Sequence, residues 1–143
     1  MNKILILNII TFLTIALFLY TGISKLIDYD VFREQIDLIP LLQPFAGVIA
    51  WLLPMVEFAT AVLLIRPGWR LFGFVAAISL MIIFTIYFIS VRIVDEKMAC
   101  SCGGIIELLS WKQHLIFNCM MIILELIAVR LQIFLESQRD LTI

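Results

Sequence analysis

The sequence has few charged residues, and the charges it has are balanced. Charged side chains make up 15% of the 143 residues, and 10 Lys and Arg against 11 Asp and Glu leave a net charge of −1. Without an excess of positive charge the chain has no basic surface of the kind that binds nucleic acid, and without a run of acidic residues it has no solvating tail. We therefore expect no nucleic-acid partner.

Cysteine is also scarce. Of the 3 cysteines, Cys100 and Cys102 form a C-x-C pair and Cys119 stands alone. A self-sufficient quinone-coupled disulfide oxidase would relay electrons through a second exposed cysteine pair, which this sequence lacks. Any thiol chemistry of this chain therefore needs a partner.

Two further absences narrow the choice of class. No A-x-A-like cleavage site follows the first apolar run, and that run is longer than the apolar region of a usual signal peptide. We therefore expect an uncleaved first helix rather than a removed signal. No internal repeat is visible either, which places a small transporter built around Glu57 and Glu125 last among the candidate functions.

Hydrophobic residues, in contrast, are abundant, at 64% of the chain with a mean hydropathy of +1.14. This composition predicts an integral membrane protein. We predict one all-α domain over residues 1–143, a four-helix bundle with up-down topology. Its transmembrane helices are expected at residues 4–23, 46–65, 71–91 and 111–134.

The connecting segments carry their own signals. Residues 25–43 are amphipathic and are expected to lie on the membrane surface. Pro54 predicts a kink in the second helix, and Ser110 with Gln113 fits a capping box that starts the fourth. The remaining long connector, residues 92–110, carries the C-x-C pair.

The positive charges decide the orientation only weakly. Five Lys and Arg fall on each side of the predicted bundle: Lys3, Arg66, Arg70, Arg130 and Arg139 against Lys25, Arg33, Arg92, Lys97 and Lys112. The Arg66 and Arg70 pair in its short turn, together with Lys3, favours their side as cytoplasmic. We therefore expect both termini in the cytoplasm of a bacterial inner membrane, with the C-x-C connector outside.

Cys100 and Cys102, followed by Gly103 and Gly104, allow three interpretations. In an oxidising compartment the pair can be redox-active, because a disulfide that spans one residue closes a tight and reducible ring. This favours a redox-active pair over the two alternatives, which are a structural pair and a site for a soft metal ion.

The predicted fourth helix carries one polar stripe, formed by Trp111, His114, Asn118 and Glu125, which fall within about 60° of each other around the helix axis. His114 lies near the start of this helix and so near the connector, where it could accept a proton from a thiol. Alternatively, His114 and Asn118 form hydrogen bonds between helices. Cys119 points about 100° away and is expected to be a small buried residue.

Glu57 and Glu125 fall inside predicted membrane spans, where a charged carboxylate is costly. Each is expected to be protonated, paired or facing an interior cavity, and each could belong to a proton path or simply form hydrogen bonds inside the bundle. We predict no resident cofactor, and we keep two candidates open, a quinone and Cu(I). The soft ligands that would bind Cu(I) are Met98, Cys100, Cys102, His114 and Met121.

Short motifs in this chain resemble a known group of proteins. The stretches YTGISKL at 20–26 and WLLP at 51–54, together with Asp28, Phe32 and Glu57, are similar to the first half of the DoxX and MauE families of small four-helix membrane proteins. The CSCGG stretch at 100–104 resembles the MauE side specifically. Gly22, Lys25, Pro54 and Glu57 match family positions without an assigned role.

The resemblance implies a role in methylamine utilisation, in which MauE-like proteins assist disulfide formation in the small subunit of methylamine dehydrogenase beside a thioredoxin-like partner. For this chain it implies that Cys100 and Cys102 are the thiol pair, while methylamine itself does not follow. The first hypothesis is thus a thiol-redox component that exchanges disulfides with a thioredoxin-like or other membrane or periplasmic protein. The alternative is a non-catalytic membrane anchor or assembly subunit of a larger complex, with the C-x-C connector as a docking surface.

Overall fold

The structure, a computed structural model, describes residues 2–94 and 110–141. Within these residues the chain forms helices and no strand. The helices are α1 (Lys3–Ile27), α2 (Tyr29–Asp37), α3 (Ala46–Ile65), α4 (Arg70–Val94) and α5 (Trp111–Asp140), with the short 3₁₀ turns η1 (Gln43–Phe45) and η2 (Pro67–Trp69). The all-α prediction is confirmed.

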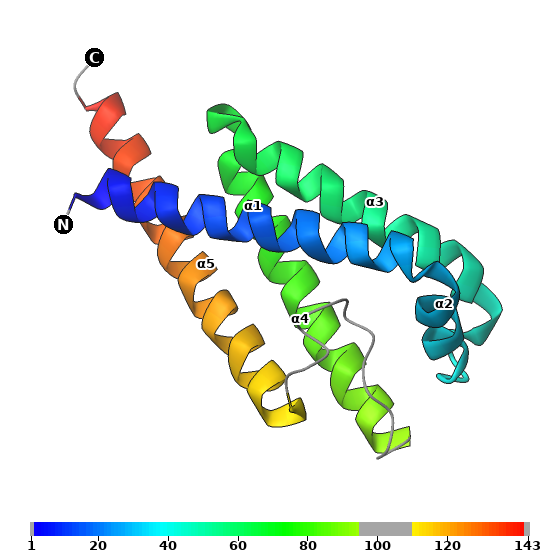
Figure 1. Ribbon diagram of the computed structural model, residues 1–143. Helices are drawn as coiled ribbons and strands as arrows, with labels where there is room; N and C mark the ends of the chain where they lie inside the picture. The colour runs from blue at the N-terminus through cyan, green and yellow to red at the C-terminus, as the bar shows by residue number, and fades with distance from the viewer. Residues whose placement is uncertain (1, 95–109, 142–143) are drawn as a thin grey trace.

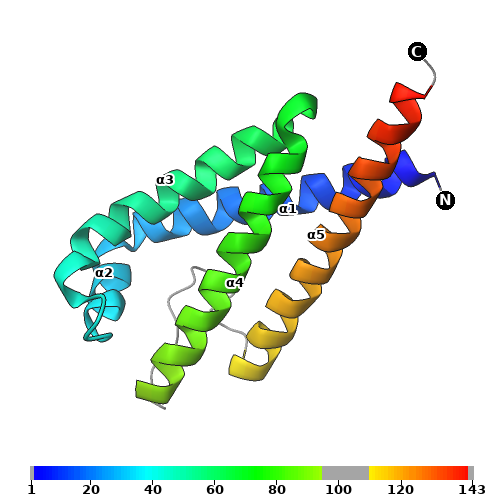
Figure 2. The same cartoon turned by 180° about the vertical axis from the view of Figure 1, so that it is seen from behind.

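The four long helices form a closed ring in which α1 packs against α3, α3 against α4, α4 against α5 and α5 against α1 (Figure 1). Both termini and the η2 turn lie at one end, and α2 lies at the opposite end (Figures 1 and 2). Two contacts close the end with the termini: Lys3 Nζ lies 3.8 Å from the ring centroid of Phe134, and Arg70 donates to Asn8 across 3.4 Å. The bundle is therefore up-down, as predicted.

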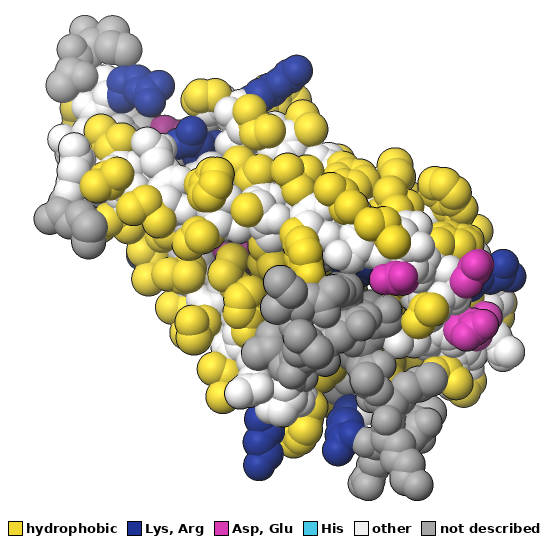
Figure 3. Space-filling view, viewed as in Figure 1, with side chains coloured by type: hydrophobic (Ala, Val, Ile, Leu, Met, Phe, Trp, Pro, Cys, Tyr) yellow, Lys and Arg dark blue, Asp and Glu magenta, His cyan; other side chains and the backbone are white. Residues whose placement is uncertain are grey.

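Among the described residues, four helical segments are long and apolar enough to cross a membrane: Lys3–Ile27, Gln43–Ile65, Pro67–Ile93 and Trp111–Asp140. Their outer faces carry exposed large hydrophobic side chains, among them Phe12, Val48, Phe72 and Ile116. Figure 3 shows hydrophobic side chains over the middle of the visible face, with charged ones toward its ends. A surface of this kind is stable against lipid and not against water, so the protein is an integral membrane protein.

Part of the region 25–43 packs against the interior of the bundle. α1 continues past its expected end to Ile27, and α2 buries Phe32 and Ile36 against Ala46 and Ala50 of α3. An apolar helix face gains stability by packing on a neighbouring helix as well as on lipid. Here the neighbouring α3 takes the buried part of α2, and this contact places α2 beside the interior of the bundle.

Three local sequence features bear on the shape of α3, on the connection from α3 to α4 and on the start of α5. Pro54 lies inside a continuous α3 and does not break it. The turn into α4 is tight because Gly73 lacks a side chain: an added Cβ would lie 2.9 Å from the backbone nitrogen of Leu64. The predicted capping box is confirmed, since the Ser110 hydroxyl accepts from Gln113 N and Gln113 Oε1 accepts from Ser110 N.

Candidate functional site

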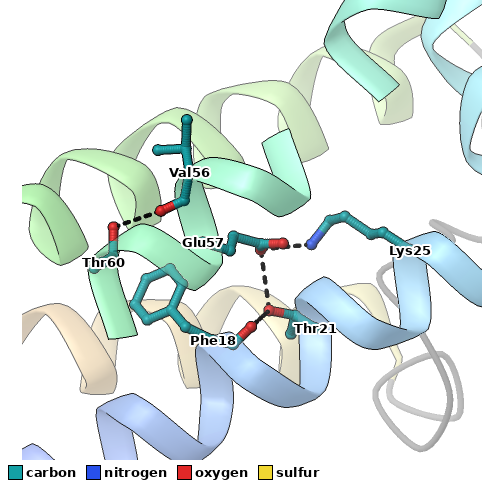
Figure 4. Close-up of polar contacts among 6 residues, drawn as sticks. All are labelled: Phe18, Thr21, Lys25, Val56, Glu57 and Thr60. Carbon is teal, nitrogen blue, oxygen red and sulfur yellow. Dashed lines mark hydrogen bonds and ion pairs between the residues drawn. The ribbon is translucent and has the colours of Figure 1, made fainter. Parts of the chain in front are cut away.

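A buried ion pair joins α1 to α3. Lys25 Nζ lies 2.7 Å from Glu57 Oε1, and these side chains are 6% and 0% exposed. The Thr21 hydroxyl donates to the same oxygen across 3.0 Å, so both donors of α1 converge on one carboxylate oxygen (Figure 4). A carboxylate inside an apolar bundle needs such partners, because an uncompensated charge there is costly.

The local sequence explains how this pair forms. Thr21 and Lys25 are four residues apart on α1 and therefore share one face of the helix. Gly22 lies between them, and a Cβ at this position would meet Phe58 Cε1 at 3.0 Å and Glu57 Oε2 at 3.4 Å. The missing side chain thus lets α1 approach α3 closely enough for Glu57 to reach both donors.

An apolar cavity of about 210 Å³ lies beside the ion pair. Its wall is built from all five helices and the segment that follows α2. The lining residues are Leu17, Phe18, Thr21, Lys25, Phe32, Ile36, Leu42, Ile49, Leu53, Met81, Ile83, Phe84, Tyr87, His114, Phe117 and Asn118. Largely apolar pockets with a few convergent polar groups are the usual form of small-molecule sites in proteins.

Two polar side chains of α5 face the same cavity. Asn118 donates from Nδ2 to Thr85 Oγ1 of α4 across 3.2 Å, and the His114 ring stacks on Phe88 with 4.5 Å between centroids. Both side chains are buried. The structure therefore brings His114 and Asn118 to one space with Lys25, whose ammonium lies 4.7 Å from the Phe84 ring centroid.

The other members of the predicted α5 stripe behave differently. Glu125 is 0% exposed, and neither of its carboxyl oxygens has a hydrogen-bond partner in the described part of the chain. Trp111 is 42% exposed and does not line the cavity, because it lies in the first turn of α5 at the rim of the bundle. The stripe thus faces inward from His114 onward and not at Trp111.

The expectation that Cys119 is buried is wrong. Its side chain is exposed on the outer face of α5, where a spanning helix meets lipid. The position follows from the 100° step between successive residues: Asn118 faces the interior, so the next residue turns away from it.

Cys100, Cys102 and Met98 lie outside the described residues. Of the proposed Cu(I) ligands, His114 and Met121 remain. They are seven residues apart on α5, about 10 Å along the helix axis. Within residues 2–94 and 110–141 no group of three or more His, Cys, Asp or Glu side chains is close enough to hold a metal ion.

Sequence reasoning did not find the role of Lys25, which it assigned to the surface segment. The signal was nevertheless present. Lys25 is a cation at the end of a spanning helix, one helical turn after Thr21, and its long apolar stem can lie along the bundle while the ammonium reaches inward. Thr85, the acceptor of the Asn118 amide, was also not predicted as part of the site.

The fold and the site together define a small integral membrane bundle with a buried ion pair beside an apolar cavity. Compared with known families, the chain matches the model described as "Methylamine utilisation protein MauE" over residues 3–131. Because this match spans most of the chain, the protein belongs to the MauE family. Searches of curated proteins and of solved structures found no match.

Proposed function

We propose that this protein is the membrane component of a thiol-disulfide exchange system, in which Cys100 and Cys102 alternate between disulfide and dithiol. The observation that carries the proposal is the position of the connector's two described ends. Val94 is the last residue of α4. Ser110 caps α5 and lies one helical turn before His114, which lines the cavity. Membership of the MauE family supports the same assignment.

The exchange step is balanced within the two proteins. A thiolate of a thioredoxin-like partner attacks one sulfur of the Cys100–Cys102 disulfide, and a mixed disulfide forms. The partner's second thiolate then resolves it. The partner's dithiol is oxidised to a disulfide, and Cys100 and Cys102 take up the two electrons and two protons. His114 accepts a proton from a thiol during this exchange.

The orientation that this chemistry needs is part of the proposal. Lys3, Arg66 and Arg70 lie at the end of the bundle that holds both termini, and cytoplasmic ends of bacterial membrane proteins are rich in such cations. The protein then lies in a bacterial inner membrane with both termini in the cytoplasm. Its C-x-C connector faces the compartment in which disulfides persist.

Thiol trapping in intact cells tests the proposal. The chain carries Cys119→Ser, so that only Cys100 and Cys102 react, and a membrane-impermeant maleimide is added with and without prior reduction. Labelling that appears only after reduction is expected, because it reports an oxidised pair outside. Labelling that requires permeabilised cells would overturn the proposed orientation, and with it the disulfide chemistry.

A second measurement separates thiol exchange from the alternative of a non-catalytic assembly subunit. The Cys100→Ser/Cys102→Ser double variant should lose mixed-disulfide capture of the partner and lose function. A double variant with full activity and an unchanged, co-purifying complex would instead favour the assembly role. Near-stoichiometric copper or zinc in the purified chain would favour a metal site.

A further inference from the structure

We propose that the cavity between the five helices binds the ring of a lipid-soluble quinone. The proposal deepens the proposed function and rests on it for its biological meaning, because it names the chemical class of the electron acceptor. The binding site itself is formed by residues that the structure describes.

The walls of the cavity suit a flat, apolar ring. A volume of about 210 Å³ holds roughly seven waters at about 30 Å³ each, yet the lining is dominated by apolar side chains, so an organic ring is the better occupant. Phe18, Phe32, Phe84, Tyr87 and Phe117 come from α1, α2, α4 and α5. Aromatic side chains favour stacked or edge-on contacts with another ring, and a saturated chain cannot form such contacts.

The polar groups at this cavity supply hydrogen bonds to a carbonyl oxygen. The Lys25 ammonium has three hydrogens and gives one to Glu57. Asn118 Nδ2 gives one of its two hydrogens to Thr85 Oγ1. The His114 ring is buried at the same cavity and stacks on Phe88. A ligand with carbonyl acceptors would satisfy these donors, whereas a hydrocarbon chain would leave them unsatisfied.

One residue of the cavity wall also reaches the outer face of the bundle, and we infer that a ligand enters from the bilayer at this point. Ile83 lines the cavity, yet its side chain is 54% exposed on α4, a helix that is long and apolar enough to span the membrane. The exposed part of the Ile83 side chain therefore faces the hydrocarbon of the bilayer. A ligand that enters past Ile83 must dissolve in lipid, which a quinone with an isoprenoid tail does and a water-soluble aromatic does not.

A quinone would complete the electron balance of the proposed function. The reduced thiols of Cys100 and Cys102 give two electrons and two protons to the quinone. The sulfur–sulfur bond forms, and the quinone becomes the quinol. Nothing else is consumed, and the quinol carries both electrons away through the bilayer.

Calorimetric titration of the purified full chain in detergent micelles tests the proposal. The ligands are ubiquinone-1 and menadione, and empty micelles correct for partitioning. An alkylbenzene, which has the ring without carbonyl oxygens, serves as the control ligand. The titration uses the Cys100→Ser/Cys102→Ser variant, so that binding is measured whether or not the thiols exchange. One saturable site for a quinone and none for the alkylbenzene is the expected result.

Two pairs of variants locate the site. Asn118→Leu removes an amide donor from the cavity and should weaken quinone binding at least tenfold, whereas Asn8→Leu, at an exposed position of the other end, should not change it. Ile83→Trp narrows the route from the bilayer and should weaken binding, whereas Ile82→Trp, its exposed neighbour outside the cavity, should not.

Both tryptophan variants change exposed positions, so they keep the test informative if Asn118→Leu fails to fold. The proposal is overturned if neither quinone saturates the chain. It is also overturned if quinone and alkylbenzene bind alike, because the cavity would then hold an acyl chain or another hydrocarbon. Equal quinone affinity across the folded variants would place binding elsewhere.

Discussion

Lys25 of α1 and Glu57 of α3 form an ion pair across 2.7 Å inside the bundle, although each belongs to a segment that is apolar enough to span a membrane. Each charge is compensated by the other, and Thr21 adds a hydrogen bond to the same carboxylate oxygen. The pair therefore fixes which faces of α1 and α3 meet, and it holds a cation at the wall of the cavity.

Breaking this pair from one side should destabilise the protein. Glu57→Leu leaves the Lys25 ammonium buried without its counter-charge, and we expect a loss of about 3–5 kcal/mol in the free energy of unfolding. The double variant Lys25→Met/Glu57→Leu removes both charges and should recover most of that loss. Unfolding by SDS titration in mixed micelles, followed by far-UV circular dichroism, measures both.

Glu34→Gln is the matched control for the ion pair, because Glu34 is exposed on α2. It should change the free energy of unfolding by less than about 0.5 kcal/mol. A double variant no more stable than Glu57→Leu would show that the pair does not act as a unit.

The close approach of α3 and α4 should depend on Gly73. Gly73→Ala would put a Cβ 2.9 Å from both the backbone nitrogen and the side chain of Leu64, so the helices must separate. We expect a loss of about 1–3 kcal/mol in the free energy of unfolding. Gly68 lies in the η2 turn, two positions before the start of α4, and a Cβ at this position would meet nothing within 4 Å. Gly68→Ala should therefore be nearly neutral. Equal effects of the two substitutions would contradict the packing explanation.

Replacing the buried carboxyl of Glu125 should stabilise the bundle. Glu125 is fully buried, and both its carboxyl oxygens lack a partner in the described part of the chain. Glu125→Met keeps the length of the side chain and removes the unsatisfied group, so we expect a gain of about 1–3 kcal/mol. Glu136→Met on the same helix loses the 2.7 Å hydrogen bond from Gln132 and should be destabilising instead. A loss of stability in Glu125→Met would show that the carboxyl has a partner.

Two of the three cysteines should be needed for disulfide exchange, and the third should not. Cys100→Ser or Cys102→Ser should abolish disulfide exchange with the partner, because either change removes the Cys100–Cys102 disulfide that the partner's thiolate attacks. Cys119→Ser should be tolerated, since Cys119 faces outward from α5. Alkylation of free thiols followed by non-reducing electrophoresis, which reports whether the partner's dithiol has been oxidised, measures all three variants. Loss of exchange in Cys119→Ser together with its retention in Cys100→Ser would contradict the proposed function.

Much of the architecture could be predicted because it depends on local sequence properties. The long apolar runs predict spanning helices, and the Ser110 and Gln113 capping box predicts the start of α5. The polar positions His114, Asn118 and Glu125 recur on one helix face, so their shared direction follows from the helical repeat. None of these inferences needs to know which helix lies opposite.

The site was harder to predict because its contacts join residues far apart in the chain. Lys25 and Glu57 are separated by 32 positions. The local sequence around Lys25 allows its ammonium to reach inward, but it does not say which residue of another helix the ammonium would meet. The error for Cys119 has a similar origin, since a small apolar residue fits equally well inside the bundle or against lipid.

The sequence by itself determined that this chain is a helical membrane protein, where its long apolar runs lie and which residues could carry thiol chemistry. Hydrophobicity, helical periodicity and capping act within a few turns of chain, so they can be read in order. Only the tertiary structure decided that Lys25 meets Glu57, that Asn118 meets Thr85 and that the five helices enclose a cavity. These features depend on how closely the faces of different helices approach one another. In this bundle the close approach of α1 and α3 is possible because Gly22 has no side chain beyond a hydrogen atom.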